Sequence, residues 1–538
     1  MLDLLIRNGT VFDGSGRPGF VADVAIEGNR IVHIGRLESA VARQVIDATG
    51  KAVAPGFIDI HTHSELPLLV DGRAMSKVMQ GVTLEVVGNC GTSPGPRTPV
   101  VEARLRALAP VDDELQQWTW QTTGEFMDKL QQRGIALNVA FLVGHGSLRT
   151  AVMGTEQRPP TPVELRQMQE RLRLELEQGA LGLSTGLIYA PSMYAQTEEL
   201  IALARVLREM GRIYASHIRG EGDTVAEAID EAITIGRQAG VPVQISHLKA
   251  TGRQNWGRAP ALLRLLEQAR GDGIDVMADQ YPYVASSTTL TAVLPPWALS
   301  GGIPQLLRRL QDLTQRALIR QQITEGVDGW VPLLRGCTFA DLIIASFAPD
   351  PSLEGQSLAD IAAQRGLDPS ELTLQLLEEA GGEVSIIRFA MSEEDVRTIL
   401  QHPLVMVGSD GSALAADGPL SRGKPHPRAY GTFPRVLGHY VRDERVLSLP
   451  EAVRKMTALP AMRLGLKERG RLVAGYRADI VVFDPATVAE RATWANPHQY
   501  PCGIEWVLVN GVPVVAYGQH TGARPGRVLR WGVAGCPE

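Results

Sequence analysis

The sequence predicts an α/β fold, because short apolar runs alternate with helical patterns between residues 56 and 407. Eight such runs occur, at Gly56 to Ile60, Thr83 to Val87, Leu137 to Val143, Leu181 to Ser184, Ile213 to Ser216, Val241 to Ser246, Ile274 to Ala278 and Leu404 to Val407. Continuous apolar runs are typical of parallel strands buried on both faces, and eight is the number that closes a TIM-type (β/α)8 barrel. We therefore expect such a barrel at the centre of the protein.

Both ends of the chain have short strand patterns and turn signals instead of helices. The patterns lie at Leu4 to Ile6, Val21 to Ile26, Arg30 to Ile34 and Gln44 to Asp47, and they return after Gly470 with a hairpin signal at Asn510-Gly511. Chain termini often lie close together. We therefore expect residues 1–55 and 470–538 to form one small β-sandwich domain around a barrel of residues 56–469, and two separate β units are the alternative.

The interval between the seventh and eighth runs is too long for one crossover helix. More than a hundred residues separate Ala278 from Leu404, whereas a helix and its loops need only about 30. We expect an insertion near residues 290–352, placed as a lid over the barrel mouth. Among the helices, residues 161–178 form an amphipathic pattern, and Ser392 with Asp395 predicts a capping box.

The composition excludes several classes of protein. The chain has 538 residues, 44% of them apolar and 21% charged, with a net charge of −6, which argues against disorder and against nucleic-acid binding. The longest uncharged stretch, residues 280–307, is broken by four prolines, so we expect no membrane partner. Four cysteines, Cys90, Cys337, Cys502 and Cys536, are too few for a disulfide scaffold and favour the cytoplasm. The oligomeric state is not specified.

Metal-ligating residues follow the strand patterns, where barrel active sites are built. His61 and His63 end the first run, and the two-residue period of a strand places both on one face. Further ligand types end later runs, namely Cys90 after run two, His217 after run five, His247 after run six and Asp410 after run eight. Imidazole, thiolate and carboxylate are the ligands of zinc. The pattern therefore predicts a zinc centre at the barrel mouth.

Two of these residues have specific expected roles. Many barrel hydrolases bridge two metals with a modified lysine at strand four, but run four reads Leu181-Gly182-Leu183-Ser184-Thr185 and has none. We therefore expect Cys90 to be the shared ligand. Asp410 is the expected general acid/base, because a carboxylate beside zinc can take a proton from water. His145, at the end of run three, is expected to be structural.

The motifs together resemble the amidohydrolase superfamily and, within it, the N-acyl-D-amino-acid deacylases. The superfamily resemblance lies in residues 53–63, in residues 470–483 and in the strand-end ligands. The narrower resemblance lies in Gly88-Asn89-Cys90-Gly91, Gly144-His145-Gly146-Ser147-Leu148-Arg149, Ser246-His247-Leu248-Lys249, Asp279-Gln280-Tyr281-Pro282-Tyr283 and the segment from His426 to Arg435. The departures are a longer loop between Asp410 and His426 and a glycine- and proline-rich tail after Gly518.

The resemblance implies a set of ligands and substrate contacts. It implies a tightly held zinc on Cys90, His217 and His247, and a second, weaker site on His61 and His63 with Cys90 and Asp410. It implies that Asp410 is the catalytic acid/base. It also implies that Lys249, Tyr281 and Arg428 receive the substrate's α-carboxylate, with Tyr283 competing for the role of Tyr281, and that Tyr189 lines the pocket.

The expected activity is zinc-dependent hydrolysis of the amide of an N-acyl-D-amino acid, which releases a carboxylate and a free D-amino acid. One alternative is a cyclic amidase of the hydantoinase or dihydroorotase kind, against which Cys90 and the missing lysine argue. The other is a metal-free barrel with a binding or structural role, but such a protein would have lost ligands. Whether the substrate's side chain is apolar or acidic is left open.

Overall fold

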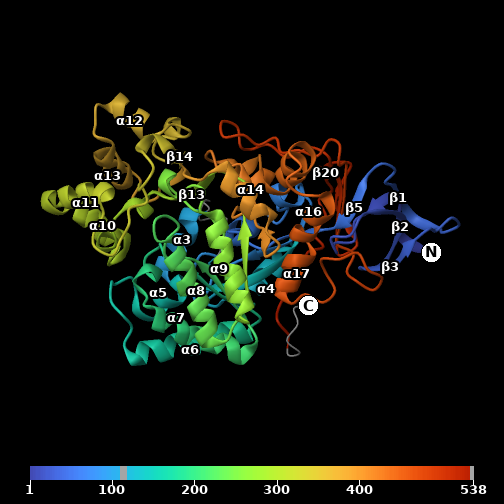
Figure 1. Ribbon diagram of the computed structural model, residues 1–538, viewed down its shortest axis with the longest axis horizontal. Coiled ribbons are helices and arrows are strands. Elements are labelled where there is room, and N and C mark those ends of the chain that lie inside the picture. Colours follow the sequence, from blue (N-terminus) through green and yellow to red (C-terminus); the bar gives the residue numbers. More distant parts are fainter. Residues whose placement is uncertain (109–117, 533–538) are drawn as a thin grey trace.

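The computed structural model describes residues 1–108 and 118–532, and its centre is a parallel barrel (Figure 1). The eight strands follow the order β6 (Phe57–Asp59), β7 (Val82–Val87), β8 (Asn138–Gly144), β9 (Gly182–Gly186), β10 (Ile213–His217), β11 (Val243–Ile245), β12 (Val276–Gln280) and β16 (Val405–Val407). Each strand overlaps one of the eight apolar runs. The predicted barrel is confirmed, because the alternation of apolar runs and helices reports the βα repeat directly.

Helices cover the outside of the barrel (Figure 1). Those that follow the strands of the first seven units are α1 (Glu65–Val70), α2 (Met75–Val78), α3 (Pro99–Leu108), α4 (Thr123–Arg133), α5 (His145–Met153), α6 (Pro162–Glu177), α7 (Thr197–Met210), α8 (Val225–Ala239) and α9 (Ala259–Gly271). After the insertion come α14 (Glu393–Gln401), α15 (Arg428–Arg435), the π-helix Val436–Asp443, α16 (Leu449–Met456) and α17 (Ala458–Leu464). Their apolar faces pack on the strands in one large core.

A reciprocal capping box forms at the start of α6 but not at the start of α14. Thr161 and Glu164 form a reciprocal capping box at the start of α6, where the amphipathic pattern predicts a helix. Ser392 caps α14 by accepting from the N–H groups of Glu394 and Asp395. The Asp395 carboxylate does not complete the predicted box, because it accepts instead from backbone N–H groups of Gly257 and Ala259 at the start of α9.

Strands from both ends of the chain form one nine-stranded sheet, drawn at the right of Figure 1. Its members are β1 (Leu2–Val11), β2 (Phe20–Glu27), β3 (Arg30–Gly35), β4 (Ala42–Asp47), β5 (Ala52–Pro55), β17 (Ile480–Phe483), β18 (Ile504–Val509), β19 (Val512–Ala516) and β20 (Gln519–His520). The antiparallel pairing of β5 with β17 joins the two halves. As predicted, both termini contribute to one β structure, and the alternative of two units is wrong.

The hairpin between β18 and β19 forms at the predicted turn. Asn510 and Gly511 have φ angles of 49° and 82°, the left-handed values that a tight two-residue hairpin requires. The chain then turns back to the barrel, where the Leu529 N–H donates to the carbonyl of Val139 at 2.7 Å. The Leu529 side chain is fully buried in the barrel interior among Ile58 and Met406. The end of the described chain therefore packs against the barrel.

The insertion between the seventh and eighth barrel strands is confirmed and extends beyond residues 290–352 on both sides. A three-stranded antiparallel sheet, β13 (Ala285–Thr289), β15 (Ser385–Phe389) and β14 (Leu342–Ser346), packs with α10 (Gly302–Gln311), α11 (Leu313–Glu325), α12 (Leu358–Arg365) and α13 (Pro369–Glu379). These elements have an apolar core of their own and project at the upper left of Figure 1. The sequence pattern missed β13 because its Ser and Thr residues lack an apolar strand signature.

A buried polar cluster joins the first and last strands of the barrel. Lys77 Nζ lies 2.9 Å from Asp59 Oδ2 and donates to Ser409 Oγ at 2.7 Å, and the Ser409 N–H donates to Asp59 Oδ1 at 2.8 Å. Lys77 and Asp59 are completely buried. The Asp410 N–H donates to the His61 carbonyl at 2.8 Å beside them. This seam therefore sets the relative positions of the β6 and β16 ends.

Replacing Lys77 should weaken the whole barrel. Lys77→Met leaves the Asp59 carboxylate buried without its cation, which should lower the free energy of unfolding by about 3–5 kcal/mol. Adding Asp59→Asn should restore part of the loss, because the unpaired charge is removed. Chemical denaturation of the two single variants and the double variant measures this coupling. Losses that simply add would contradict a paired seam.

Candidate metal centre and active site

Ligand-type side chains from five strands meet at the carboxyl end of the barrel. His61 Nε2 lies 3.3 Å from Cys90 Sγ, which lies 3.6 Å from His247 Nε2. His247 Nε2 in turn lies 2.9 Å from His217 Nδ1. On the other side, His63 Nε2 lies 3.0 Å from Asp410 Oδ1. The six predicted ligands thus form one continuous cluster.

The backbone is strained at three of these positions. Cys90, His247 and Asp410 have φ angles of 52°, 36° and 50°, although none is glycine. Left-handed conformations of this kind cost free energy and persist at functional sites where the surrounding structure imposes them. Each residue lies two or three positions beyond the end of its strand, in the turn that leaves the barrel.

The Cys90 thiol lies in a setting that favours the thiolate. Burial alone raises its pKa, but the adjacent positive charge of His61 and hydrogen bonds from His217 and His247 outweigh burial. The net pKa of Cys90 lies well below its ordinary value. A deprotonated thiol is the form that binds metal, so the residue is prepared as a ligand.

Asp410 is held by two cationic partners. His63 Nε2 lies 3.0 Å from one carboxylate oxygen, and Arg428 Nη1 lies 2.9 Å from the other. Burial raises the pKa of Asp410. The charges of Arg428 and His61 and the hydrogen bond from His63 outweigh burial, so the net pKa lies well below its ordinary value. The carboxylate is therefore ionised and fixed in orientation.

Two acids that the sequence analysis did not assign as site residues orient the histidines. Asp279 Oδ1 lies 3.1 Å from His61 Nδ1 and accepts the His247 backbone N–H at 2.8 Å. Glu221 Oε1 lies 3.2 Å from His247 Nδ1 and accepts from Lys249 Nζ at 2.6 Å. Such outer partners fix the tautomer of a metal-binding histidine. The available signals were the Asp after run seven and an acid four residues beyond His217.

The donor set fits zinc. His61, Cys90, His247 and Asp410 offer ligand atoms within 4.8 Å of one another, and so do His217, Glu221 and His247. His63 Nδ1 and His217 Nε2 are buried without a hydrogen-bond partner among the described residues. Nitrogen, thiolate sulfur and carboxylate oxygen are the atoms that zinc binds. The two groups share His247, so the arrangement can hold two ions side by side.

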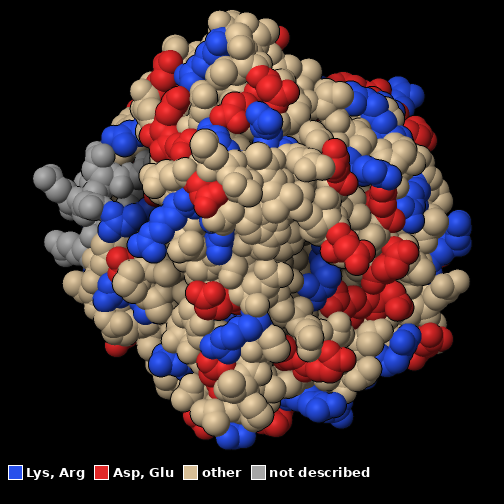
Figure 2. Space-filling view, turned by 90° about the vertical axis from the view of Figure 1, so that its left-hand side faces the viewer, with Lys and Arg blue, Asp and Glu red and all other residues tan. Residues whose placement is uncertain are grey.

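A cavity of about 740 Å³ opens above this cluster. Its wall contains His63, Cys90, His217, His247 and Asp410 from the barrel, and residues of β13, β15 and α10 from the insertion. Apolar residues line its outer part, among them Val100, Leu299, Ile303 and Leu333. Figure 2 shows acidic and basic side chains intermixed over the face on the left-hand side of Figure 1.

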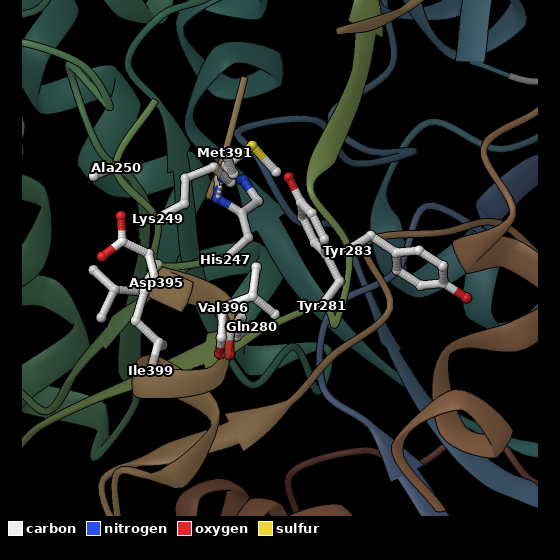
Figure 3. A pocket seen from close by; sticks show the side chains of 11 residues that line it. His247, Lys249, Ala250, Gln280, Tyr281, Tyr283, Met391, Asp395, Val396 and Ile399 are labelled. Atoms are coloured by element: carbon white, nitrogen blue, oxygen red, sulfur yellow. Dashed lines mark hydrogen bonds between the residues drawn. The ribbon is translucent and has the colours of Figure 1, made fainter. Parts of the chain in front are cut away.

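Four of the five predicted substrate contacts line this cavity, namely Tyr189, Lys249, Tyr281 and Arg428. Tyr283 does not line it, because its hydroxyl donates to Glu490 at 2.7 Å. Figure 3 shows a smaller neighbouring pocket, which both tyrosines line; in this view Tyr281 lies alongside His247, and the Tyr283 ring is directed away from them. The Tyr281 hydroxyl is buried without a hydrogen-bond partner among the described residues. The structure therefore favours Tyr281 over Tyr283 as a ligand contact.

Two further residues named in the sequence analysis can be located in the structure. Arg428 begins helix α15 and is 5% exposed, so it is buried. His145 is fully buried and bonded to Ser192 and Glu199, as expected of a structural residue.

The chain resembles known proteins over its full length. The amidohydrolase family model matches residues 44–515. A D-aminoacylase of Alcaligenes xylosoxydans xylosoxydans is 42% identical over 98% of this chain and 97% of that protein, and an N-acyl-D-glutamate deacylase of the same organism is 41% identical over 100% and 99%. A crystal structure of the N-acyl-D-glutamate deacylase of Bordetella bronchiseptica, complexed with zinc and a phosphonate inhibitor, superposes with a TM-score of 0.82 at 40% identity over 98% and 99% of the two chains. The chain therefore belongs to the amidohydrolase family.

Proposed function

We propose that this protein is a zinc-dependent hydrolase of N-acyl-D-amino acids that releases a carboxylate and a free D-amino acid. The observation that carries the proposal is the buried Cys90 side chain between His61 and His247, with Asp410 in the same cluster. D-aminoacylase and N-acyl-D-glutamate deacylase activities are named for the relatives that align over almost the whole chain. The Bordetella enzyme was solved with zinc and a mimic of the tetrahedral intermediate of the reaction.

Cys90, His217 and His247 would hold one zinc ion firmly, because a thiolate and two imidazoles are three strong zinc ligands. His61 and His63, with Cys90 and Asp410 as shared ligands, would hold a second ion more weakly. When bound, zinc polarises the amide carbonyl and activates water for attack near neutral pH. Asp279 and Glu221 keep the ring nitrogens of His61 and His247 in place for this role.

Asp410 carries the proton. Its carboxylate is ionised and fixed between His63 and Arg428, so it accepts a proton from the attacking water. It then donates that proton to the nitrogen of the departing amine. A rigid carboxylate suits both steps, because proton transfer needs a short, aligned contact at each end.

Tyr281 and two cations orient the substrate's α-carboxylate. Burial raises the pKa of Tyr281 well above its ordinary value, so the hydroxyl stays protonated and can donate. Lys249 Nζ and the Arg428 guanidinium lie 5.3 Å and 4.7 Å from the centre of its ring. A carboxylate held at this point presents the amide of one stereoisomer to the zinc centre and to Asp410.

We also propose that the protein works in the cytoplasm. Cys90, Cys337 and Cys502 are free thiols, and Cys536 lies outside the described residues. A reducing compartment keeps the Cys90 thiolate available as a ligand. In the part of the chain that the structure describes, no helix combines the length and apolar character needed to span a membrane.

The activity is tested with N-acetyl-D- and N-acetyl-L-amino acids assayed for free amine. The D-isomers should have a kcat/KM at least about tenfold higher, because the L-isomers misplace one charge-assisted contact. Dihydrouracil and a hydantoin serve as comparison substrates. Faster turnover of these cyclic amides than of any N-acyl-D-amino acid would favour a cyclic amidase.

Replacing Cys90 should remove the shared metal ligand. Cys90→Ser should lose the firmly bound zinc, since a serine hydroxyl is a poor zinc ligand at neutral pH. Cys502→Ser, at an exposed position in the β domain, is the matched control and should retain it. Elemental analysis after dialysis measures both. Equal zinc contents would show that Cys90 is not a ligand.

Replacing Asp410 should separate catalysis from metal binding. Asp410→Asn should lower kcat by about 10²- to 10⁴-fold, the usual contribution of a general acid/base. The firmly bound zinc should stay, because Cys90, His217 and His247 are intact. Steady-state kinetics and zinc content, measured on the same preparation, distinguish a loss of catalysis from a loss of metal. A kcat close to the wild-type value would assign the proton transfer to another group.

A further inference from the structure

Arg388, on strand β15, is a buried cation without a partner. It is 2% exposed, and Nε is shielded from solvent without a hydrogen-bond partner. Among the described residues, no hydrogen bond or ion pair engages its guanidinium. A charge removed from water in this way is costly unless an anion accompanies it. Within residues 1–108 and 118–532, no acid supplies the anionic partner that this buried guanidinium needs.

The position of Arg388 connects it with the catalytic centre. It lines the 740 Å³ cavity and lies opposite Ser286 in the antiparallel pairing of β13 with β15, so both side chains share one face of the sheet. Thr288 lies two residues along β13 on that face, and its hydroxyl lies 3.0 Å from the Tyr189 hydroxyl. The Tyr189 ring lies 5.1 Å from the ring of His217. Contacts thus lead from the metal cluster to the neighbourhood of Arg388.

The other buried cations of the cavity wall are already paired. Lys249 donates to Glu221 at 2.6 Å, and Arg428 lies 2.9 Å from Asp410. Of these three buried cations, all within the described residues, only Arg388 lacks a charged partner. Lys249 and Arg428 flank Tyr281, where the α-carboxylate is received. Arg388 lies instead on the insertion, so it is available for a second anionic group.

We propose that Arg388 binds the side-chain carboxylate of an acidic N-acyl-D-amino acid, so that the substrates are N-acyl derivatives of D-glutamate or D-aspartate. This inference rests on the proposed function. The planar guanidinium matches a carboxylate with two parallel N–H donors, and a dicarboxylic substrate supplies the missing anion. Ser286, opposite Arg388, adds a hydroxyl donor on the same face. An aliphatic side chain would leave the charge buried and unpaired.

The test compares kcat/KM for N-acetyl-D-glutamate, N-acetyl-D-aspartate and N-acetyl-D-leucine. The wild-type enzyme should favour an acidic substrate over N-acetyl-D-leucine by at least about tenfold. Arg388→Met should lower kcat/KM for the acidic substrates by about ten- to a hundredfold, as expected for a lost charge-assisted contact. N-acetyl-D-leucine should change by less than about threefold.

Two further variants control for folding and for charge. Arg388→Lys keeps the charge but lacks the two parallel N–H donors of the guanidinium. It should therefore cause a smaller loss of kcat/KM, again confined to the acidic substrates. Arg320→Met removes an exposed arginine of α11 and should leave all three substrates unchanged. Arg388→Met should melt no lower than the wild type, because it replaces an unpaired buried charge with an apolar chain.

Three results would overturn the inference. A wild-type preference for N-acetyl-D-leucine would do so while leaving the proposed function intact. An equal loss with acidic and neutral substrates in Arg388→Met would place Arg388 at the α-carboxylate, which all three substrates share. If the wild type hydrolyses no N-acyl-D-amino acid at all, the proposed function itself fails.

Discussion

The closure of the barrel between β6 and β16 is the constraint on which the site depends. Lys77, Asp59 and Ser409 form a buried polar seam there, and the backbone beside them joins His61 to Asp410. Without closure, the first and last strands would not bring their ends together. The ligands that come earliest and latest in the sequence, His61 and Asp410, would then lie far apart, because an open sheet separates its two edges.

The barrel mouth holds many charges, and their mutual pairing makes their burial tolerable. Cys90, Asp410 and Glu221 each have a pKa well below the ordinary value, and in each case neighbouring cationic groups outweigh the penalty of burial. The same pairing fixes the orientation of the side chains, because each acid is held by at least two partners. The low dielectric of the protein interior strengthens these contacts, so the charged side chains hold one another in place.

The residues proposed for catalysis and the residue proposed for substrate selection lie in different parts of the chain. The candidate metal ligands, Asp410 among them, lie on the barrel, at the carboxyl ends of five of its strands. Arg388 and the apolar residues of the outer cavity lie largely on the insertion, which has its own core. Under the proposed roles, changes in the insertion would alter the preference for the substrate's side chain without disturbing the cluster of candidate ligands. This division is typical of barrel enzymes, whose function varies in the loops.

The sequence by itself determined the barrel, the β domain from both termini and the set of candidate ligands. Local signals were enough, because apolar runs report buried parallel strands and His61-x-His63 follows one of them directly. Only the tertiary structure decided which side chains face one another. Tyr281 and Tyr283 are two residues apart, yet one lines the cavity and the other bonds Glu490. Arg388 carries no local motif, and the role proposed for it depends on its burial and on the lack of a charged partner among the described residues. Both are properties of packing between distant segments.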